Sequence, residues 1–306
     1  MKWLTFKLFF LLIFFYSGFI FSQSKIETYL KPADSLDNKR LKTVVITEAA
    51  LASGALIGLN ELWYNDYPKS SFHFINDNSE WLQMDKIGHI YSSYHIGKIG
   101  ASALKWSGVN RKKQLICGAT LGFAFLSVVE VFDGYSTEWG ASSGDIIANA
   151  TGTTLYVSQE LLWKEQRIIP KFSFHTTSYA AYRPNVLGSS LSEQILKDYN
   201  GQTYWLSANI NSFYKNEILP KWLNLAIGYG AEGMFSGNVS SITSNSLSES
   251  SRFRQFYVSF DVDLSKIETK SQLLKTFFSI FNTVKIPAPT FEINASRASQ
   301  FHLFYF

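Results

Sequence analysis

The chain has 306 residues and a formal net charge of +4, from 28 Lys and Arg against 24 Asp and Glu. Its length allows one large domain or two smaller ones. So small a positive excess, without a concentrated basic stripe or a glycine-rich phosphate loop, argues against nucleic acid and nucleotides as partners. The aromatic content of 16% is high and indicates either a membrane-facing surface or a large β core.

The N-terminus has the composition of a secretory signal peptide. Lys2 and Lys7 provide the positive region, and the apolar run from Leu8 to Phe21 is too short for an ordinary membrane span. We therefore expect residues 1–22 to be a signal peptide that is cleaved on export. A retained N-terminal anchor is the competing interpretation.

Four apolar helical runs are expected after a polar, irregular segment at residues 23–40. Their predicted ranges are 41–63, 85–106, 110–132 and 143–163. The first run is long enough to cross a membrane, but a helix buried on two sides has the same composition, and we favour the buried helix. Ser143 is the expected N-cap of the fourth run, and Cys117 is expected to be buried in the third. Mostly short connections predict a compact four-helix bundle over residues 41–165.

After Pro170 the apolar spacing changes from helical to alternating. Residues 166–306 are predicted to form an antiparallel β region with short helices, which makes the chain an α+β protein. Strand-like stretches cover residues 171–183, 202–214, 222–231 and 254–264, and helical ones cover 190–199 and 270–284. The helix at 190–199 begins with the capping-box pattern of Ser190 and Glu193.

The stretch 254–264 alternates most regularly. Phe256, Val258 and Phe260 point to one side, and polar residues between them point to the other. The aromatic end of the chain, residues 301–306, is typical of the last strand of an outer-membrane barrel. A single-chain barrel needs about eight strands, more than we count. Alternation alone does not separate a barrel-like sheet in the outer membrane from a soluble sheet packed on the helices.

Three short polar motifs lie inside the helical runs. Each holds a pair of polar residues three or four positions apart: Asp85 with His89, Glu130 with Asp133, and Asp145 with Asn149. At these spacings the members of a pair share one face of a helix. Three such helices packed together would gather four carboxylates, a histidine and an amide in one buried place, which is costly unless the groups serve a purpose.

The series of motifs reads Asp85-Lys86-x-x-His89, Glu130-x-x-Asp133 and Ser142-x-x-Asp145-x-x-x-Asn149-x-x-Gly152. In order and spacing it resembles the YfiM-type family of predicted periplasmic lipoproteins, a domain of unknown function, and more distantly the VanZ-like membrane proteins. The resemblance covers roughly residues 41–165. It implies a helical architecture in the envelope of a Gram-negative bacterium. The family's lipid-anchor cysteine is missing after the apolar run, so we expect a soluble periplasmic protein or attachment by another surface.

Two interpretations of the motifs involve no catalysis. In the first, the motifs form a buried network that fixes the register of the helices, with contributions from Lys86, Ser143, Asn149 and Gly152. In the second, the ligand-type side chains bind a divalent metal ion, because carboxylates and histidine suit such ions. The candidate ligands are Asp85, His89, Glu130, Asp133 and Asp145.

A third interpretation is hydrolysis or group transfer on a glycan or lipid of the envelope. His89 would serve as general base, oriented by Asp85, with Glu130 or Asp133 as the acid. We expect an exported envelope protein with a structural or binding role, whose partner is the outer membrane or another envelope component. The alternative is an envelope enzyme that uses a divalent metal at this cluster.

Overall fold

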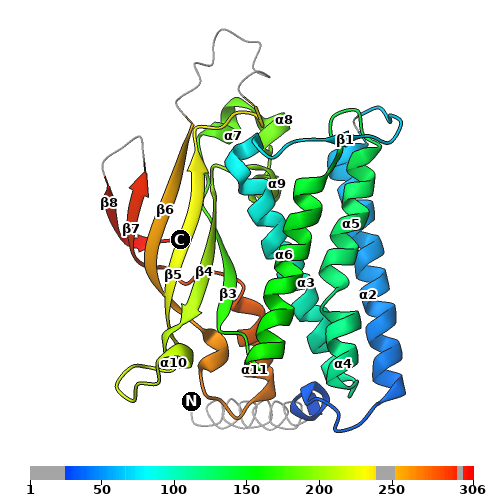
Figure 1. The fold of residues 1–306 in the computed structure, drawn as a ribbon, viewed down its shortest axis with the longest axis vertical. Helices are drawn as coiled ribbons and strands as arrows, with labels where there is room; N and C mark the ends of the chain where they lie inside the picture. Colours follow the sequence, from blue (N-terminus) through cyan, green and yellow to red (C-terminus); the bar gives the residue numbers. More distant parts are fainter. Residues whose placement is uncertain (1–24, 66, 239–251, 295–298) are drawn as a thin grey trace, which may run out of the picture.

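The computed structural model describes residues 25–65, 67–238, 252–294 and 299–306. The expected signal peptide lies outside these residues. Long helices form one layer of the molecule and a six-stranded antiparallel sheet forms the other, with the helices and strands running in roughly the same direction (Figure 1). The chain is therefore of mixed helix and sheet class, as the sequence predicts.

The long helices begin and end close to the predicted positions. They are α2 (Asn38–Leu59, continued by η1, Asn60–Tyr64), α3 (Met84–Trp106), α5 (Leu121–Gly134, preceded by α4, Arg111–Lys113, and η3, Gln114–Gly118) and α6 (Ser143–Leu162). Asp37 caps α2 and Asn110 caps α4. The prediction that Ser143 caps α6 is wrong: the hydroxyl of Ser142 accepts a hydrogen bond from the backbone N–H of Asp145, and Ser143 is the first helical residue.

The predicted compact four-helix bundle is not confirmed. Helices α3, α5 and α6 pack against one another, while α2 lies outside them and buries only Val44 among its own residues. The expectation that this first helix is buried on two sides is therefore wrong. Cys117, expected to be buried, is exposed on η3. Both differences have one cause, which is that apolar side chains on these helices face outward as well as inward.

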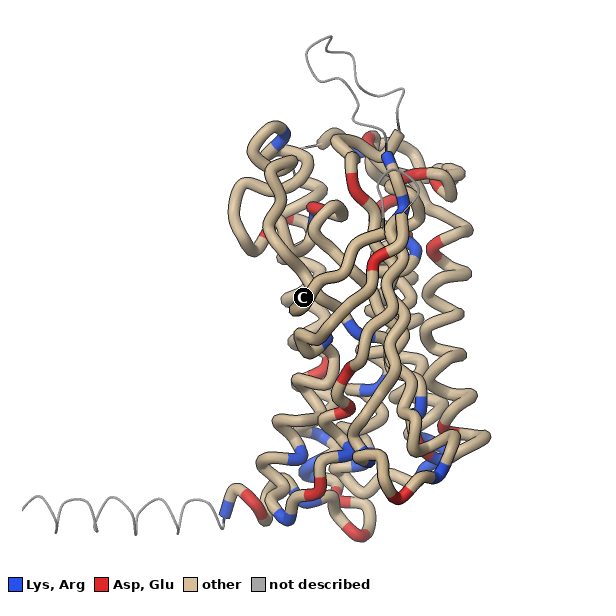
Figure 2. The backbone as a smooth tube through the Cα atoms, turned by 90° about the vertical axis from the view of Figure 1, so that its left-hand side faces the viewer, with Lys and Arg blue, Asp and Glu red and all other residues tan. Residues whose placement is uncertain are grey.

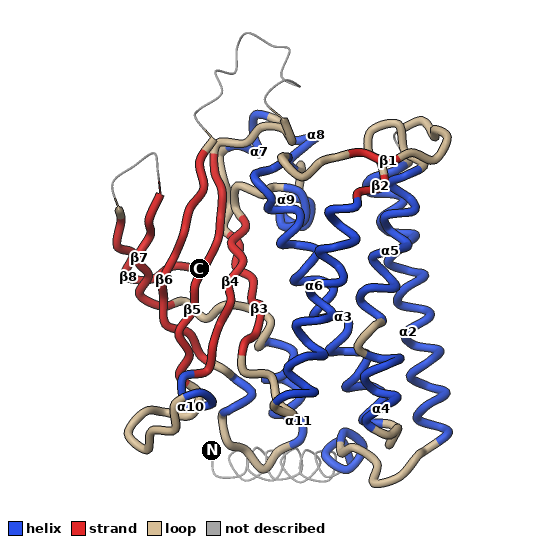
Figure 3. Tube along the Cα trace, viewed as in Figure 1, coloured by secondary structure: helices blue, strands red, loops and turns tan. Residues whose placement is uncertain are grey.

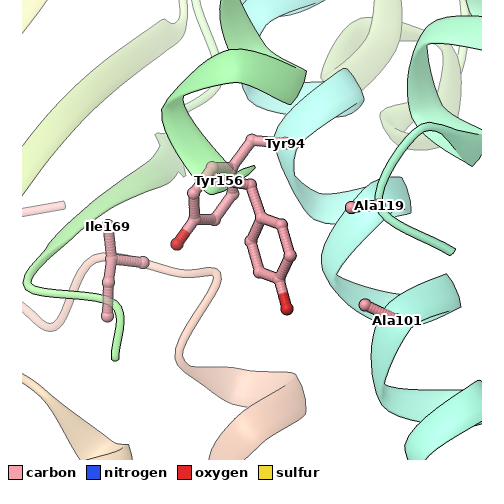
Figure 4. Packing of buried hydrophobic residues seen from close by; sticks show 5 residues of the cluster. All are labelled: Tyr94, Ala101, Ala119, Tyr156 and Ile169. Carbon is pink, nitrogen blue, oxygen red and sulfur yellow. The ribbon is translucent and has the colours of Figure 1, made fainter. Parts of the chain in front are cut away.

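Glycines allow the three inner helices to approach closely. A Cβ atom on Gly122 of α5 would lie 2.1 Å from the backbone oxygen of Ser93 in α3, and one on Gly152 of α6 would lie 2.2 Å from that of Ile90. Where the helices meet the sheet, a core cluster is formed by Tyr94, Ala101, Ala119, Tyr156 and Ile169 (Figure 4).

The strands follow the order β3-β4-β5-β6-β7-β8, and β3 and β8 are the edges of an open sheet among the described strands (Figure 3). Their bounds are β3 Ile168–Phe174, β4 Gln202–Asn209, β5 Leu223–Glu232, β6 Phe253–Val262, β7 Ala288–Asn294 and β8 Gln300–Tyr305. The sheet is not closed into a barrel. It is nevertheless curved, because Tyr305 on β8 contacts the ring of Trp205 on β4 with centroids 6.0 Å apart.

Short helices interrupt two of the predicted strands. The stretch 171–183 is a strand only to Phe174 and then contains α7 (Tyr179–Tyr182), and the stretch 202–214 ends in α10 (Ile210–Phe213). The remaining short elements are β1 (Phe74–Ile75), η2 (Glu80–Gln83), β2 (Ala141–Ser142), α8 (Pro184–Leu187), α9 (Leu191–Lys197), η5 (Leu264–Lys266) and α11 (Gln272–Phe281). The predicted capping box is confirmed at the start of α9.

The two faces of the sheet have the reverse of the usual polarity. The predicted alternation is confirmed along β6, but its apolar side is exposed: Phe256, Val258 and Phe260 are 51%, 43% and 53% exposed. Exposed apolar residues continue this outer face across the other strands: Leu206, Leu225, Ile227, Phe291, Ile293, Phe301 and Leu303. The buried inner face carries mostly polar residues, including Ser173, Thr203, Ser207, Asn209, Asn224, Ser259, Asp261 and Thr290. Part of the apolar face packs on α3, where Tyr91 contacts Phe172 and Tyr204, and the polar face lies inside the curve of the sheet. A soluble sheet with helices on one face instead turns its polar face toward solvent.

Ion pairs and hydrogen bonds satisfy this buried polar face. The ammonium of Lys171 lies 2.7 Å from Oδ2 of Asp261, and both side chains are fully buried. Asp261 also accepts a 2.6 Å hydrogen bond from Ser207. Lys285 lies 4.0 Å from the other carboxylate oxygen of Asp261 and over the ring of Trp205. The interior of the sheet therefore holds paired charges, which is the condition under which charges are tolerated away from water.

Candidate functional site

The three sequence motifs meet at one end of the helical layer. Asp85, Lys86 and His89 lie in the first two turns of α3, and Asp145 and Asn149 lie in the first two turns of α6. Glu130 and Asp133 come from the last turn or so of α5. Since α5 ends where α3 and α6 begin, the polar faces of all three helices are brought together.

Lys86 is the cation at the centre of the acidic groups. Its ammonium lies 2.7 Å from Oδ2 of Asp77, 3.2 Å from Oδ2 of Asp85 and 2.8 Å from Oδ1 of Asp145. Asp77 also accepts a 2.6 Å hydrogen bond from the hydroxyl of Ser142. The sequence analysis missed Asp77, because it lies in a polar loop where an aspartate carries no distinguishing signal.

The surroundings lower the pKa of Asp85, in the first turn of α3, and raise the pKa of Asp145, in the first turn of α6. Burial raises the pKa of Asp85, but the charges of His89 and Lys86 and a hydrogen bond from Tyr199 outweigh it, so the net pKa is lowered. Burial and then the nearby charge of Asp85 raise the pKa of Asp145 to about 7. Burial lowers the pKa of Lys86, yet its carboxylate neighbours raise it overall. One lysine therefore does not neutralise the whole cluster.

His89 is held by Asn149 instead of Asp85. Its Nδ1 lies 2.9 Å from Oδ1 of Asn149, so with the amide in this orientation Nδ1 carries the hydrogen and Nε2 is free to accept or bind. Nε2 lies 3.8 Å from Oδ1 of Asp85, too far for a hydrogen bond, and 3.9 Å from both Oε1 of Glu130 and Oδ1 of Asp145. The hydrogen bond to the imidazole therefore comes from Asn149, while Asp85 lies at ion-pair distance and its orienting role stays a prediction.

Glu130 is the most enclosed carboxylate of the cluster, with 3% of the residue exposed. Its Oε2 accepts a 3.0 Å hydrogen bond from the backbone N–H of Ser142. Its Oε1 is buried, faces Nε2 of His89 and has no hydrogen-bond partner among the residues that the structure describes. A buried carboxylate oxygen without a partner is costly, so the structure leaves here an acceptor that a proton or a cation would satisfy.

Asp133 belongs to the edge of the cluster. Its Oδ1 accepts a 2.6 Å hydrogen bond from the hydroxyl of Tyr64 at the end of η1. Three ligand-type residues have donor atoms within 4.8 Å of one another, namely Asp85, His89 and Asp145. Of the five metal ligands proposed from sequence, the geometry thus gathers Asp85, His89 and Asp145. Glu130 approaches this group through His89, with 3.9 Å between Oε1 and Nε2, and Asp133 is engaged by Tyr64.

The supporting residues predicted from sequence have separate roles. Lys86 neutralises the acidic groups, Asn149 orients His89, and Gly152 allows α6 to reach α3. Ser143 makes none of the hydrogen bonds described for the cluster, where Ser142 acts in its place. Tyr64 and Tyr199 were not foreseen, because both come from segments outside the motifs.

A cavity of ≈ 610 Å³ opens beside the cluster. Asp85, His89, Asp133 and Asp145 form its polar side. The other lining residues include acidic and aliphatic side chains and a set of aromatic and basic ones from distant segments: Trp63, Tyr64, Trp81, Trp139, Arg183, Lys197 and Tyr199. A cavity of this size with a few polar groups at one side suits a small ligand or part of a larger one.

Comparison with known proteins adds one finding. Residues 72–160 match the model of a family described as "Predicted periplasmic lipoprotein (DUF2279)". The matched segment covers α3, α5 and α6 together with the cluster from Asp77 to Asn149. No curated protein and no solved structure matches the chain significantly. The names YfiM-type and VanZ-like find no support in these comparisons.

Proposed function

We propose that this protein is a cell-envelope protein that is embedded in a membrane and binds a ligand through the cluster at one end of its helices. The reversed polarity of the sheet carries the proposal. A sheet with a polar, paired interior and an apolar outer face is the arrangement of strands that face lipid. Strands β5 and β6 have 10 residues each, within the range of about 9–11 for strands that cross a bilayer.

The helical layer supports the same proposal. Two stretches are long and apolar enough to cross a membrane: Asn38–Tyr64 with 27 residues and Arg111–Gly134 with 24. Only 6% and 28% of their most apolar windows are buried inside the protein, whereas the core helix of a soluble protein is mostly buried. Most charged residues gather toward the two ends of the molecule, most densely at the lower end in Figure 2. Large apolar side chains are exposed on α2, on α5 and on the outer face of the sheet, and in this proposal they form an apolar belt around the middle of the molecule.

The family match is in line with an envelope location, and the partner in this proposal is the outer membrane. Washing isolated membranes with sodium carbonate and then with high salt tests the embedding, because an embedded belt resists both. Release of the mature protein into the supernatant would contradict the proposal. Separation of inner from outer membranes on a density gradient then decides between the two membranes.

A second candidate function is hydrolysis or group transfer on a glycan or lipid. It is favoured by the cavity that opens directly on His89, whose Nε2 has no hydrogen-bonding neighbour and is free to act as a base. Substitution of His89 by Gln, followed by assay of envelope lipids and glycans in cells, tests this candidate. Unchanged envelope composition in cells that carry the folded variant would argue against it.

A further inference from the structure

The imidazole of His89 faces carboxylates from three helices beside the cavity. Nε2 of His89 lies at nearly equal distances from three carboxylate oxygens: 3.8 Å from Asp85, 3.9 Å from Glu130 and 3.9 Å from Asp145. Two donor atoms bound to one tetrahedral metal ion at 2.0–2.1 Å lie about 3.4 Å apart. The donor atoms of Asp85, His89 and Asp145 all lie within 4.8 Å of one another, so movements of up to about 1.5 Å would bring these three to bonding distance of a single ion. The oxygen of Glu130 lies outside this group and would have to move toward it.

The buried carboxylate of Glu130 provides a second observation, independent of the distances around His89. Its carboxylate is almost wholly buried, one oxygen is fixed by the backbone N–H of Ser142, and the other points at His89 without a hydrogen-bond partner. An ordinary buried network would provide a donor for that oxygen, since unpaired buried acceptors are rare. A cation or a proton between Glu130 and His89 would satisfy this oxygen.

The imidazole is already oriented as in a metal site. The side chain of Asn149 accepts the hydrogen of Nδ1, which leaves the lone pair of Nε2 directed at the carboxylates. Metal-bound histidines are commonly held in this way through their second nitrogen. Asn149 is itself fully buried, and Ser93 donates a 2.6 Å hydrogen bond to its backbone oxygen, so its own position is fixed by α3.

We propose that Asp85, His89, Glu130 and Asp145 bind one divalent first-row transition-metal ion at the end of α3, α5 and α6. One nitrogen and three oxygen donors suit Zn²⁺ or Mn²⁺ better than Ca²⁺ or Mg²⁺, which prefer oxygen alone. The ammonium of Lys86 contacts Oδ1 of Asp145, which also faces His89, and lies 2.9 Å from Oδ2 of the same carboxylate. A bound ion would take Oδ1 and leave the ammonium on Oδ2. The ion would face the cavity, where a ligand can reach it.

The experiment uses the full mature chain, stripped with EDTA and purified in detergent. Zn²⁺ is titrated by calorimetry, and Co²⁺ is used as a second probe because its visible absorption reports the bound nitrogen and oxygen donors. We expect one ion per chain. The visible absorption bands of bound Co²⁺ should be those of a site with low coordination symmetry. A stoichiometry well below one Zn²⁺ per chain in folded, stripped protein would overturn the proposal. Equal affinities for Ca²⁺ and Zn²⁺ would also overturn it.

Matched variants locate the site. Glu130→Gln removes the unpartnered oxygen with little change in shape and should abolish stoichiometric binding. Asp133→Asn is the control, because Asp133 lies on the same helix and lines the same cavity but is engaged by Tyr64. Equal loss of Zn²⁺ binding in both variants would mean that the ion is attracted by the overall negative charge. It would overturn the assignment of Glu130 as a ligand.

A third variant keeps the test valid if Glu130→Gln does not fold. Asn149→Ala leaves all four ligands in place, and loss of such a supporting residue weakens metal binding by about 10–100-fold. An unchanged Zn²⁺ affinity in this variant would count against the proposed role of His89. Because binding is measured in detergent, these outcomes do not depend on whether the chain is embedded in a membrane.

Discussion

Tyr199 donates a 2.7 Å hydrogen bond to Oδ1 of Asp85, although the two residues are 114 positions apart in the chain. Tyr199 follows α9, and Asp85 lies in the first turn of α3. The bond therefore connects the region that precedes β4 to the polar cluster. It also helps to keep Asp85 ionised, because a hydrogen bond to a carboxylate favours its charged form.

We expect Tyr199→Phe to lower the free energy of unfolding by about 1–3 kcal/mol, because it removes a hydrogen bond to a buried charged group. Thermal unfolding of the purified chain in detergent measures this change. Tyr214→Phe is the matched control, since Tyr214 is 69% exposed and its loss should leave the unfolding temperature unchanged. Equal effects in the two variants would show that the bond to Asp85 contributes nothing.

Close packing of α6 against α3 predicts a large difference between two glycines. A Cβ atom on Gly152 would lie 2.2 Å from the backbone oxygen of Ile90, whereas one on Gly54 of α2 would meet nothing within 4 Å. We expect Gly152→Ala to destabilise the protein by about 1–3 kcal/mol or to displace α6. Gly54→Ala should be neutral or stabilising by up to about 1 kcal/mol, since alanine favours the helix. Unfolding curves for the pair test this contrast.

The buried ion pair in the sheet predicts sensitivity to loss of one partner. Lys171→Met leaves the carboxylate of Asp261 buried with Lys285 at 4.0 Å as its remaining cation, and we expect a cost of about 3–5 kcal/mol. Lys221→Met removes the partner of Glu268 at an exposed pair and should change the unfolding temperature little. Similar stability of the two variants would contradict the interpretation of the inner face as a low-dielectric interior.

The apolar outer face predicts where a charge weakens membrane attachment. Val258 lies in the middle of β6 with its side chain 43% exposed. We expect Val258→Lys to lower the fraction of protein that resists carbonate extraction, because a lysine at mid-depth on a lipid-facing strand costs about 2–4 kcal/mol. Ile218→Lys is the control, at a loop residue that is 90% exposed. If only Ile218→Lys lowered the carbonate-resistant fraction, the proposed orientation of the sheet, with its apolar face toward lipid, would be refuted.

Glu80 predicts a pH dependence at the mouth of the cavity. Burial, followed by the charge of Asp77, raises the pKa of Glu80 above its ordinary value. A carboxyl group whose pKa is raised on folding contributes most stability when it is protonated, and this contribution is lost as pH rises from the unfolded toward the folded pKa. Glu80→Gln keeps an acceptor for Asn238 and should remove this loss. The difference between the unfolding free energies of the two proteins should therefore grow from pH 4 to neutrality, and a constant difference would contradict the prediction.

The helices and their caps follow from local sequence signals. Ser190 and Glu193 form the predicted capping box, and the polar pairs of α3, α5 and α6 share helix faces as their spacing requires. These features depend on residues within one or two turns, so the chain around them is sufficient to predict them. The breaks after Phe174 and Asn209 were missed, because apolar alternation there continues beyond the hydrogen-bonded strand.

The cluster was predictable in composition and not in detail. Spacing alone places Asp85 with His89, Glu130 with Asp133, and Asp145 with Asn149, each pair on one face of its own helix. It does not show that Asn149 orients the imidazole or that Tyr64 engages Asp133, since these contacts depend on how the helices rotate against each other. Asp77 and Tyr199 enter from separate segments that only long-range packing brings near.

Local periodicity therefore establishes the long helices, the alternating strands and the shared faces of the polar pairs, because each depends on near neighbours in the chain. The direction in which each face points depends on tertiary packing. Alternation along β6 is identical whether Val258 or Ser259 faces inward, and the paired charges of Lys171 and Asp261 show that the polar side is buried. Long-range contacts between elements thus turn an ordinary strand pattern into a sheet with an apolar exterior and a polar interior.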